Sequence, residues 1–107
     1  MVLAGCQLGR PKPGAGLASA DPLERIQAIV AAGETRDASA VPLLVDRLED
    51  EDQAVRFYAI QALTRITGQD MGYRYYRPFW ERARAVRRWR GFLEHRAASR
   101  PATQAVD

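Results

Sequence analysis

The chain contains one pattern of residue types twice, at an interval of 31 residues. The first copy begins at Asp21 and carries Arg25 four positions later, and the second begins at Asp52 and carries Arg56. A repeat near this length is typical of a solenoid of stacked helices. One such unit cannot bury its apolar face alone, so neighbouring units pack on each other and present an extended surface that usually binds other molecules. We therefore expect an all-α fold.

The equivalence of Arg25 and Arg56 favours a structural role for both over the alternative of a ligand-binding arginine. We expect each stem to pack along the stack and each guanidinium to bond to a capping aspartate. Asp21 and Asp52 are the expected structural partners of this pattern, since each precedes a helical stretch.

Capping residues and apolar spacing predict four helices, at about residues 22–32, 38–48, 53–67 and 79–94. The first begins after the N-cap Asp21, with Glu24 as the partner in a capping box, and Gly33 is expected to end it in a left-handed conformation. Pro42 falls about one turn into the second helix, where a proline bends the first turn. The acidic residues 49–52 are expected to cap the third helix, with a cation site as the alternative.

Length and composition limit the chain to one small domain. Its 107 residues are 47% apolar, which is near the size at which a single core is only marginally stable. Cys6 is the only cysteine and His95 the only histidine, so an intramolecular disulfide and a structural zinc are excluded, and we expect no metal and no cofactor. No apolar run reaches the length of about 18 residues that a membrane-spanning helix needs.

Residues 1–20 are rich in glycine, proline, alanine and serine, which is the composition of a flexible tether. Leu3-Ala4-Gly5-Cys6 resembles the lipobox of bacterial lipoproteins, and the resemblance implies a lipid on Cys6 and a place in the bacterial cell envelope. Only five residues precede Cys6, fewer than an export leader needs. Either the true start lies upstream, or the match is accidental and the protein is cytoplasmic.

The segment Asp37-x-x-Ala40-Val41-Pro42-Leu43-Leu44, followed by Leu48-x-Asp50-Glu51-Asp52-x-x-Val55-Arg56-x-x-Ala59-x-x-Ala62-Leu63, resembles a HEAT repeat of the short, phycobilisome-lyase type. The resemblance covers residues 37–68, and the internal repeat adds half a unit at 21–33. It implies a right-handed stack of antiparallel helix pairs that binds proteins, and it transfers no catalytic residue. About one and a half repeats are present, fewer than the three that such arrays need, so the ends must be covered.

The C-terminal helix is the expected cover of the stack. Its apolar side is predicted to carry Phe79, Ala83, Val86, Trp89 and Leu93, and Trp80 is expected to add buried aromatic area. The predicted helical domain therefore spans residues 21–96, and a disordered tail occupies 97–107. The expected fold is a short α-solenoid capped by an aromatic and arginine-rich helix.

Residues 71–100 carry nine arginines against Glu81 and Glu94, and aromatics alternate with arginines before the last helix. The candidate binding surface consists of Tyr73, Arg74, Tyr76, Arg77, Arg84, Arg87 and Arg88. Such a pattern holds single-stranded nucleic acid in some proteins. The alternatives are tyrosines that pack the loop onto the repeat with their hydroxyls in water, and contact with anionic lipid or a protein.

The sequence shows no converging nucleophile, base or acid pair, so we expect no enzyme activity. The favoured function is a protein-binding module tethered to a bacterial membrane through Cys6. The alternatives are a soluble nucleic-acid-binding helical protein and a lyase-like or enzyme-associated subunit.

Overall fold

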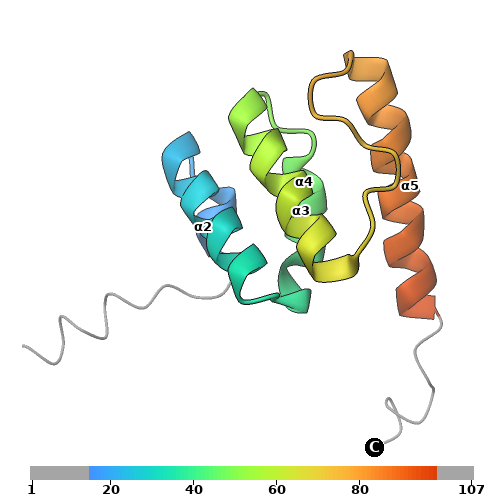
Figure 1. The fold of residues 1–107 in the computed structure, drawn as a ribbon, viewed down its shortest axis with the longest axis horizontal. Coiled ribbons are helices and arrows are strands. Elements are labelled where there is room, and N and C mark those ends of the chain that lie inside the picture. Colours follow the sequence, from blue (N-terminus) through green and yellow to red (C-terminus); the bar gives the residue numbers. More distant parts are fainter. Residues whose placement is uncertain (1–14, 99–107) are drawn as a thin grey trace, which may run out of the picture.

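The computed structural model of the chain describes residues 15–98, and all the regular secondary structure in this range is helical, as predicted. The elements in chain order are the 3-10 helix η1 (Ala15–Ala18), α2 (Pro22–Glu34), the 3-10 helix η2 (Ala38–Ala40), α3 (Val41–Arg47), α4 (Gln53–Thr67) and α5 (Phe79–Ala98) (Figure 1). The predicted lipobox, most of the predicted tether and residues 99–107 of the predicted tail lie outside the described residues.

The helices form a short solenoid of two rows. α2 and α4 lie side by side and share the most extensive helix interface, and α3 packs on α4 as the first member of the second pair (Figure 1). η1 packs on α2 and also reaches α3, so it occupies the place of a shortened first helix in the preceding repeat. This arrangement confirms the predicted short all-α solenoid.

The approach of α2 to α4 depends on Gly33. We expected this glycine to end the first helix, but α2 continues to Glu34, and Arg36 takes the left-handed position instead, with φ of 50°. A Cβ atom on Gly33 would lie 3.1 Å from the Cβ of Ala62, so the missing side chain lets the two helices pack closely. The prediction was wrong because the sequence pattern of a packing glycine and a capping glycine is the same near a helix end.

Three local predictions, on the tether, on Glu24 and on Pro42, need correction. The end of the predicted tether packs: Leu17 is 2% exposed and belongs to the core. Glu24 does not close a capping box, because its carboxylate accepts a hydrogen bond from the hydroxyl of Ser19. Pro42 lies within the first two positions of α3, since η2 precedes that helix, and a proline costs no helical hydrogen bond there.

α5 covers the end of the stack along its middle turns only. Ala85, Val86 and Trp89 are buried, whereas Phe79 and Trp80 are 68% and 63% exposed. The expectation that Phe79 and Trp80 are buried is therefore wrong. The reason is one of length: 20 residues of helix extend about 30 Å, whereas the 7-residue α3 that supports α5 extends about 10 Å.

Candidate functional site

Arg25 and Arg56 make the same hydrogen bond in the two copies of the repeat. Nη1 of Arg25 donates to the carbonyl of Ser19 at 2.7 Å, and Nη1 of Arg56 donates to the carbonyl of Asp50 at 2.8 Å, six residues earlier in each copy. Both arginines are 9% exposed. Each also reaches the next layer of the stack, Arg25 through the carboxylate of Asp50 and Arg56 through the carbonyl of Tyr75.

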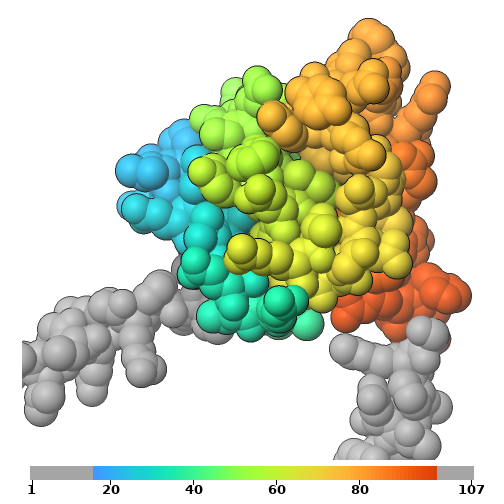
Figure 2. Space-filling model, in the orientation of Figure 1, coloured from blue at the N-terminus to red at the C-terminus, as the bar shows by residue number. Residues whose placement is uncertain are grey.

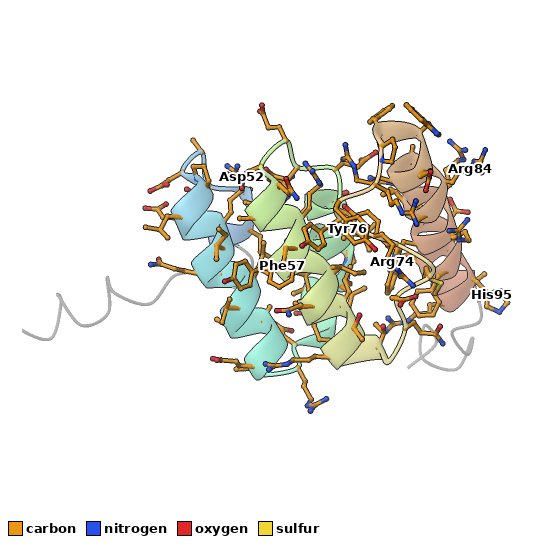
Figure 3. All side chains as sticks on the ribbon, turned by 45° about the horizontal axis from the view of Figure 1, so that its top comes forward. Asp52, Phe57, Arg74, Tyr76, Arg84 and His95 are labelled. Carbon is orange, nitrogen blue, oxygen red and sulfur yellow. The ribbon has the colours of Figure 1, made fainter. Side chains whose placement is uncertain are left out.

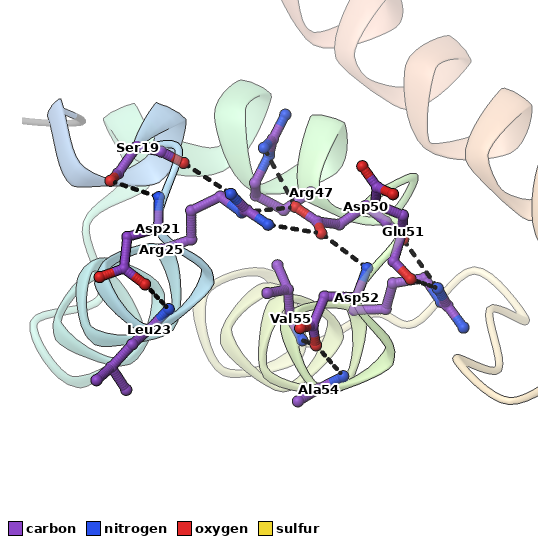
Figure 4. A network of polar contacts seen from close by, with 11 residues as sticks. Ser19, Asp21, Leu23, Arg25, Arg47, Asp50, Glu51, Asp52, Ala54 and Val55 are labelled. Carbon is purple, nitrogen blue, oxygen red and sulfur yellow. Dashed lines mark hydrogen bonds and ion pairs between the residues drawn. The ribbon is translucent and has the colours of Figure 1, made fainter.

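Asp50 is the centre of this network (Figure 4). Its side chain is 3% exposed and forms ion pairs with Arg25 at 2.8 Å and Arg47 at 3.3 Å, while Oδ1 accepts the amide of Asp52 at 3.0 Å. The expected partner of the arginines was a capping aspartate, but the N-cap of α4 is Asp52, which accepts only amides of its own helix. The repeated arginines therefore hold the turns of the stack in place. Since they are buried and engaged there, we expect the binding surface at other residues.

Tyr73 anchors the segment that connects α4 to α5. We expected Tyr73 either on an exposed binding surface or packed on the repeat with its hydroxyl in water. Instead, Tyr73 is 2% exposed, and its hydroxyl donates a hydrogen bond to the carbonyl of Leu48 at 2.7 Å. Burial raises the pKa of Tyr73 to about 12, although the nearby charges of Arg56 and Arg82 oppose this shift. Tyr73 is thus a part of the core and is removed from the candidate binding residues.

A groove follows the flank of α4 that faces away from α2. It has a volume of about 770 Å³, and its walls are α4, with Phe57, Ile60 and Thr64, and residues 69–78, with Tyr76. Figure 2 shows residues 69–78, in yellow to orange, directly beside α4 on one face of the molecule. We refer to this feature as the α4 groove.

The rim of the α4 groove is mainly basic. Arg36, Arg65 and Arg74 line it together with a single carboxylate, Asp70, which pairs with Arg74 at 3.3 Å. Ring contacts tie the walls together, since Phe57 and Tyr75 meet edge to face at a centroid distance of 5.1 Å. The groove therefore combines an apolar floor with positive charge at its edge.

A second hollow, of about 490 Å³, lies between residues 72–77 and the first turns of α5. Its lining includes Arg74, Arg77, Arg84 and Arg88, with Trp80 and the carboxylate of Glu81. We call it the arginine pocket. The structure thus brings together four of the predicted binding arginines, and Figure 3 places Arg74 and Arg84 on the two segments that form the pocket.

The other predicted binding residues lie elsewhere. Arg87 is exposed on α5 but does not line either hollow, and Tyr76, 57% exposed, lines the α4 groove. Sequence reasoning missed Phe57 and Ile60, which lie off the core stripe of α4. Their signal was present in the sequence, because apolar residues at these positions widen the apolar face beyond what one interface requires.

Within residues 15–98, no helix has the length and apolar character that crossing a membrane requires. The same residues contain no group of three or more His, Cys, Asp or Glu side chains placed to hold a metal ion.

Comparison with protein families gives a match to the model for HEAT repeats over residues 11–73. The match covers more than half of the chain and ends at the tyrosine that anchors the connection to α5. A comparison with curated proteins and with solved structures gave no match. The likeness to the phycobilisome-lyase type stays a prediction, since the match is to HEAT repeats in general. With its repeated helix pairs and this match, the chain belongs to the family of HEAT-repeat proteins.

Proposed function

We propose that this chain is a non-catalytic module that binds another protein through the α4 groove. The observation that carries the proposal is the free flank of α4. HEAT repeats commonly mediate contacts between proteins, and in such stacks each unit packs on the next. In this chain α2 packs on one flank of α4, while residues 69–78 border the other flank and leave an apolar hollow.

The partner best suited to the groove is an amphipathic helix with acidic residues beside its apolar stripe. Phe57 and Ile60 offer apolar surface at the spacing of adjacent helical turns, which suits a helix laid along α4. Three arginines against Asp70 at the rim favour a partner of negative charge.

A photo-crosslinking amino acid at Gln61 tests this proposal. Gln61 is exposed and lines the groove, and Gln27, exposed on α2 and outside the groove, is the matched control position. We expect crosslinks from Gln61 and not from Gln27, to a segment that is helical, amphipathic and acidic. The peptide of that segment should bind the unmodified protein and lose affinity for Gln61→Glu, while Gln27→Glu has no effect.

Crosslinks to one partner with equal yield from both positions would contradict the groove as the binding site. A crosslinked segment that is basic or extended would contradict the chemistry proposed for the partner. Unchanged affinity of the peptide for Gln61→Glu would contradict the proposed contact of an acidic partner with the groove.

We further propose that the module is tethered through a lipid on Cys6, which lies outside the described residues. The support is the Leu3-Ala4-Gly5-Cys6 pattern alone. The test is metabolic labelling with an alkyne fatty acid of the protein expressed from its native gene with the upstream sequence intact. We expect label on the wild-type protein and none on Cys6→Ser, and an unlabelled wild type found in the cytoplasm would refute the tether.

A further inference from the structure

Three residues that line the arginine pocket lie on one face of α5. Trp80, Arg84 and Arg88 lie four residues apart, so they share one face of the helix. Nε of Arg88 donates to the carbonyl of Met71 at 2.9 Å, which fixes the guanidinium at the wall of the pocket. One of the basic groups is therefore held in place before any ligand arrives.

Gly72 makes room for this arrangement. Its φ is +75°, a conformation that favours glycine, and a Cβ atom there would lie 2.9 Å from Nη2 of Arg88. The backbone of residues 69–78 thus lies directly against the guanidinium, and a side chain at position 72 would displace it.

The positive charge of the pocket is only partly balanced. Arg77 lies 3.8 Å from Glu81, and Arg74 lies 3.3 Å from Asp70, which lines the α4 groove and not this pocket. Arg84 makes no hydrogen bond or ion pair with any residue that the structure describes. Like charges gathered in one hollow repel each other, and an anion between them relieves this repulsion.

We propose that the arginine pocket binds a phosphate monoester, with its phosphate between Arg84 and Arg88 and its organic group against Trp80. The planar guanidinium forms paired hydrogen bonds with phosphate oxygens, and a monoester dianion offers more charge to several arginines than a carboxylate. Trp80 lines the pocket and is 63% exposed, so it supplies an apolar wall for the organic group next to the phosphate. The ester is either a soluble aryl or nucleoside monophosphate or the headgroup of phosphatidic acid.

Titration of the full chain with phenyl phosphate, followed by NMR, tests the proposal. The indole N–H of Trp80 reports on the pocket, and that of Trp89, which donates to the carbonyl of Asp70 at 3.2 Å in the core, is the internal reference. We expect a saturable shift of the Trp80 signal and weaker binding of inorganic phosphate, which lacks the ring. The absence of a saturable shift with both compounds would overturn the proposal.

Two arginine variants separate the pocket from general attraction to charge. Arg84→Gln should weaken binding of phenyl phosphate about tenfold or more, the loss expected for a charged hydrogen-bond donor. Arg87→Gln removes the same charge from the same helix outside the pocket and should leave the affinity unchanged. Equal weakening by both variants would show a diffuse electrostatic effect and contradict the pocket.

Vesicles and an oligonucleotide distinguish the sources of phosphate. Binding to phosphatidylcholine vesicles containing phosphatidic acid, lost in Arg84→Gln and absent with phosphatidylglycerol, would identify the lipid monoester as the ligand. Binding of phenyl phosphate without vesicle binding would identify a soluble ester. Equal binding to both anionic lipids, or tighter binding of a single-stranded oligonucleotide without a terminal phosphate, would contradict selectivity for a monoester.

Discussion

Replacing Tyr73 by phenylalanine should destabilise the protein although it removes only one oxygen atom. The hydroxyl of Tyr73 donates to the carbonyl of Leu48 at 2.7 Å in a site where the tyrosine is 2% exposed. In Tyr73→Phe that buried carbonyl loses its donor and has no compensating contact from the phenyl ring. We expect the free energy of unfolding to fall by about 1 to 3 kcal/mol at neutral pH.

The same hydroxyl predicts how the stability of the wild-type protein depends on alkaline pH. Burial raises the pKa of Tyr73 from 10.0 to about 12 in the fold, so the unfolded chain ionises first as the pH rises. The stabilising contribution is fully present below the unfolded pKa of 10.0 and is lost as the pH rises through about 12. This loss amounts to about 1 kcal/mol near pH 11 and approaches about 2 to 3 kcal/mol at higher pH.

Urea unfolding followed by circular dichroism, at about pH 8 and about pH 11, measures both effects. The difference between wild type and Tyr73→Phe should shrink at the higher pH, because the variant lacks the ionising group. Tyr76→Phe is the matched control, since Tyr76 is 57% exposed, and its stability should stay close to that of the wild type. If Tyr73→Phe matches the wild type at about pH 8, or both lose stability in parallel up to about pH 11, our reasoning on the buried hydroxyl is wrong.

Three further substitutions, the last with Trp80→Ala as its matched control, test the packing of the stack by the midpoint of urea unfolding. Asp50→Ala should cost about 3 to 5 kcal/mol, because it leaves a buried guanidinium without its carboxylate. Gly33→Val should cost about 1 to 3 kcal/mol, because the new side chain meets Ala62 on α4. Trp89→Ala should cost about 3 to 5 kcal/mol, whereas Trp80→Ala should change stability by less than about 0.5 kcal/mol; equal costs would contradict the position of α5.

The helices and their caps could be predicted from the sequence because their determinants are local. Asp21 and Asp52 accept amides two or three residues ahead, and Gly68, a glycine just past the apolar stripe, ends α4 with φ of +76°. The repeat interval was sufficient to predict the fold class, because residues at equivalent positions of a repeat pack on equivalent neighbours. Neither of these signals depends on where distant segments lie.

The positions of Tyr73 and Trp80 could not be predicted, because they depend on where α5 meets the stack. Both are aromatics next to arginines in sequence, yet one is in the core and the other projects beyond α3. A hydrogen bond to the carbonyl of Leu48, 25 residues away, holds Tyr73 in the core. The greater length of α5 compared with α3 leaves Trp80 exposed. The composition of residues 71–80 is compatible with burial or with exposure of each aromatic residue, so it does not predict which of them enters the core.

The α4 groove and the arginine pocket have one structural cause. The chain does not follow α4 with another helix of the same row; residues 69–78 pass beside α4 and then lead into α5, which packs on α3 (Figure 1). The segment is too narrow to cover the flank of α4, which leaves the α4 groove on one side, and its glycine-containing turn lies against α5, which forms the arginine pocket on the other. Arg74 lines both, and the buried Tyr73 beside it holds the segment to the core. It follows that loss of the Tyr73 hydroxyl bond should loosen both proposed binding surfaces together, whereas changes at Gln61 or Arg84 should affect only one.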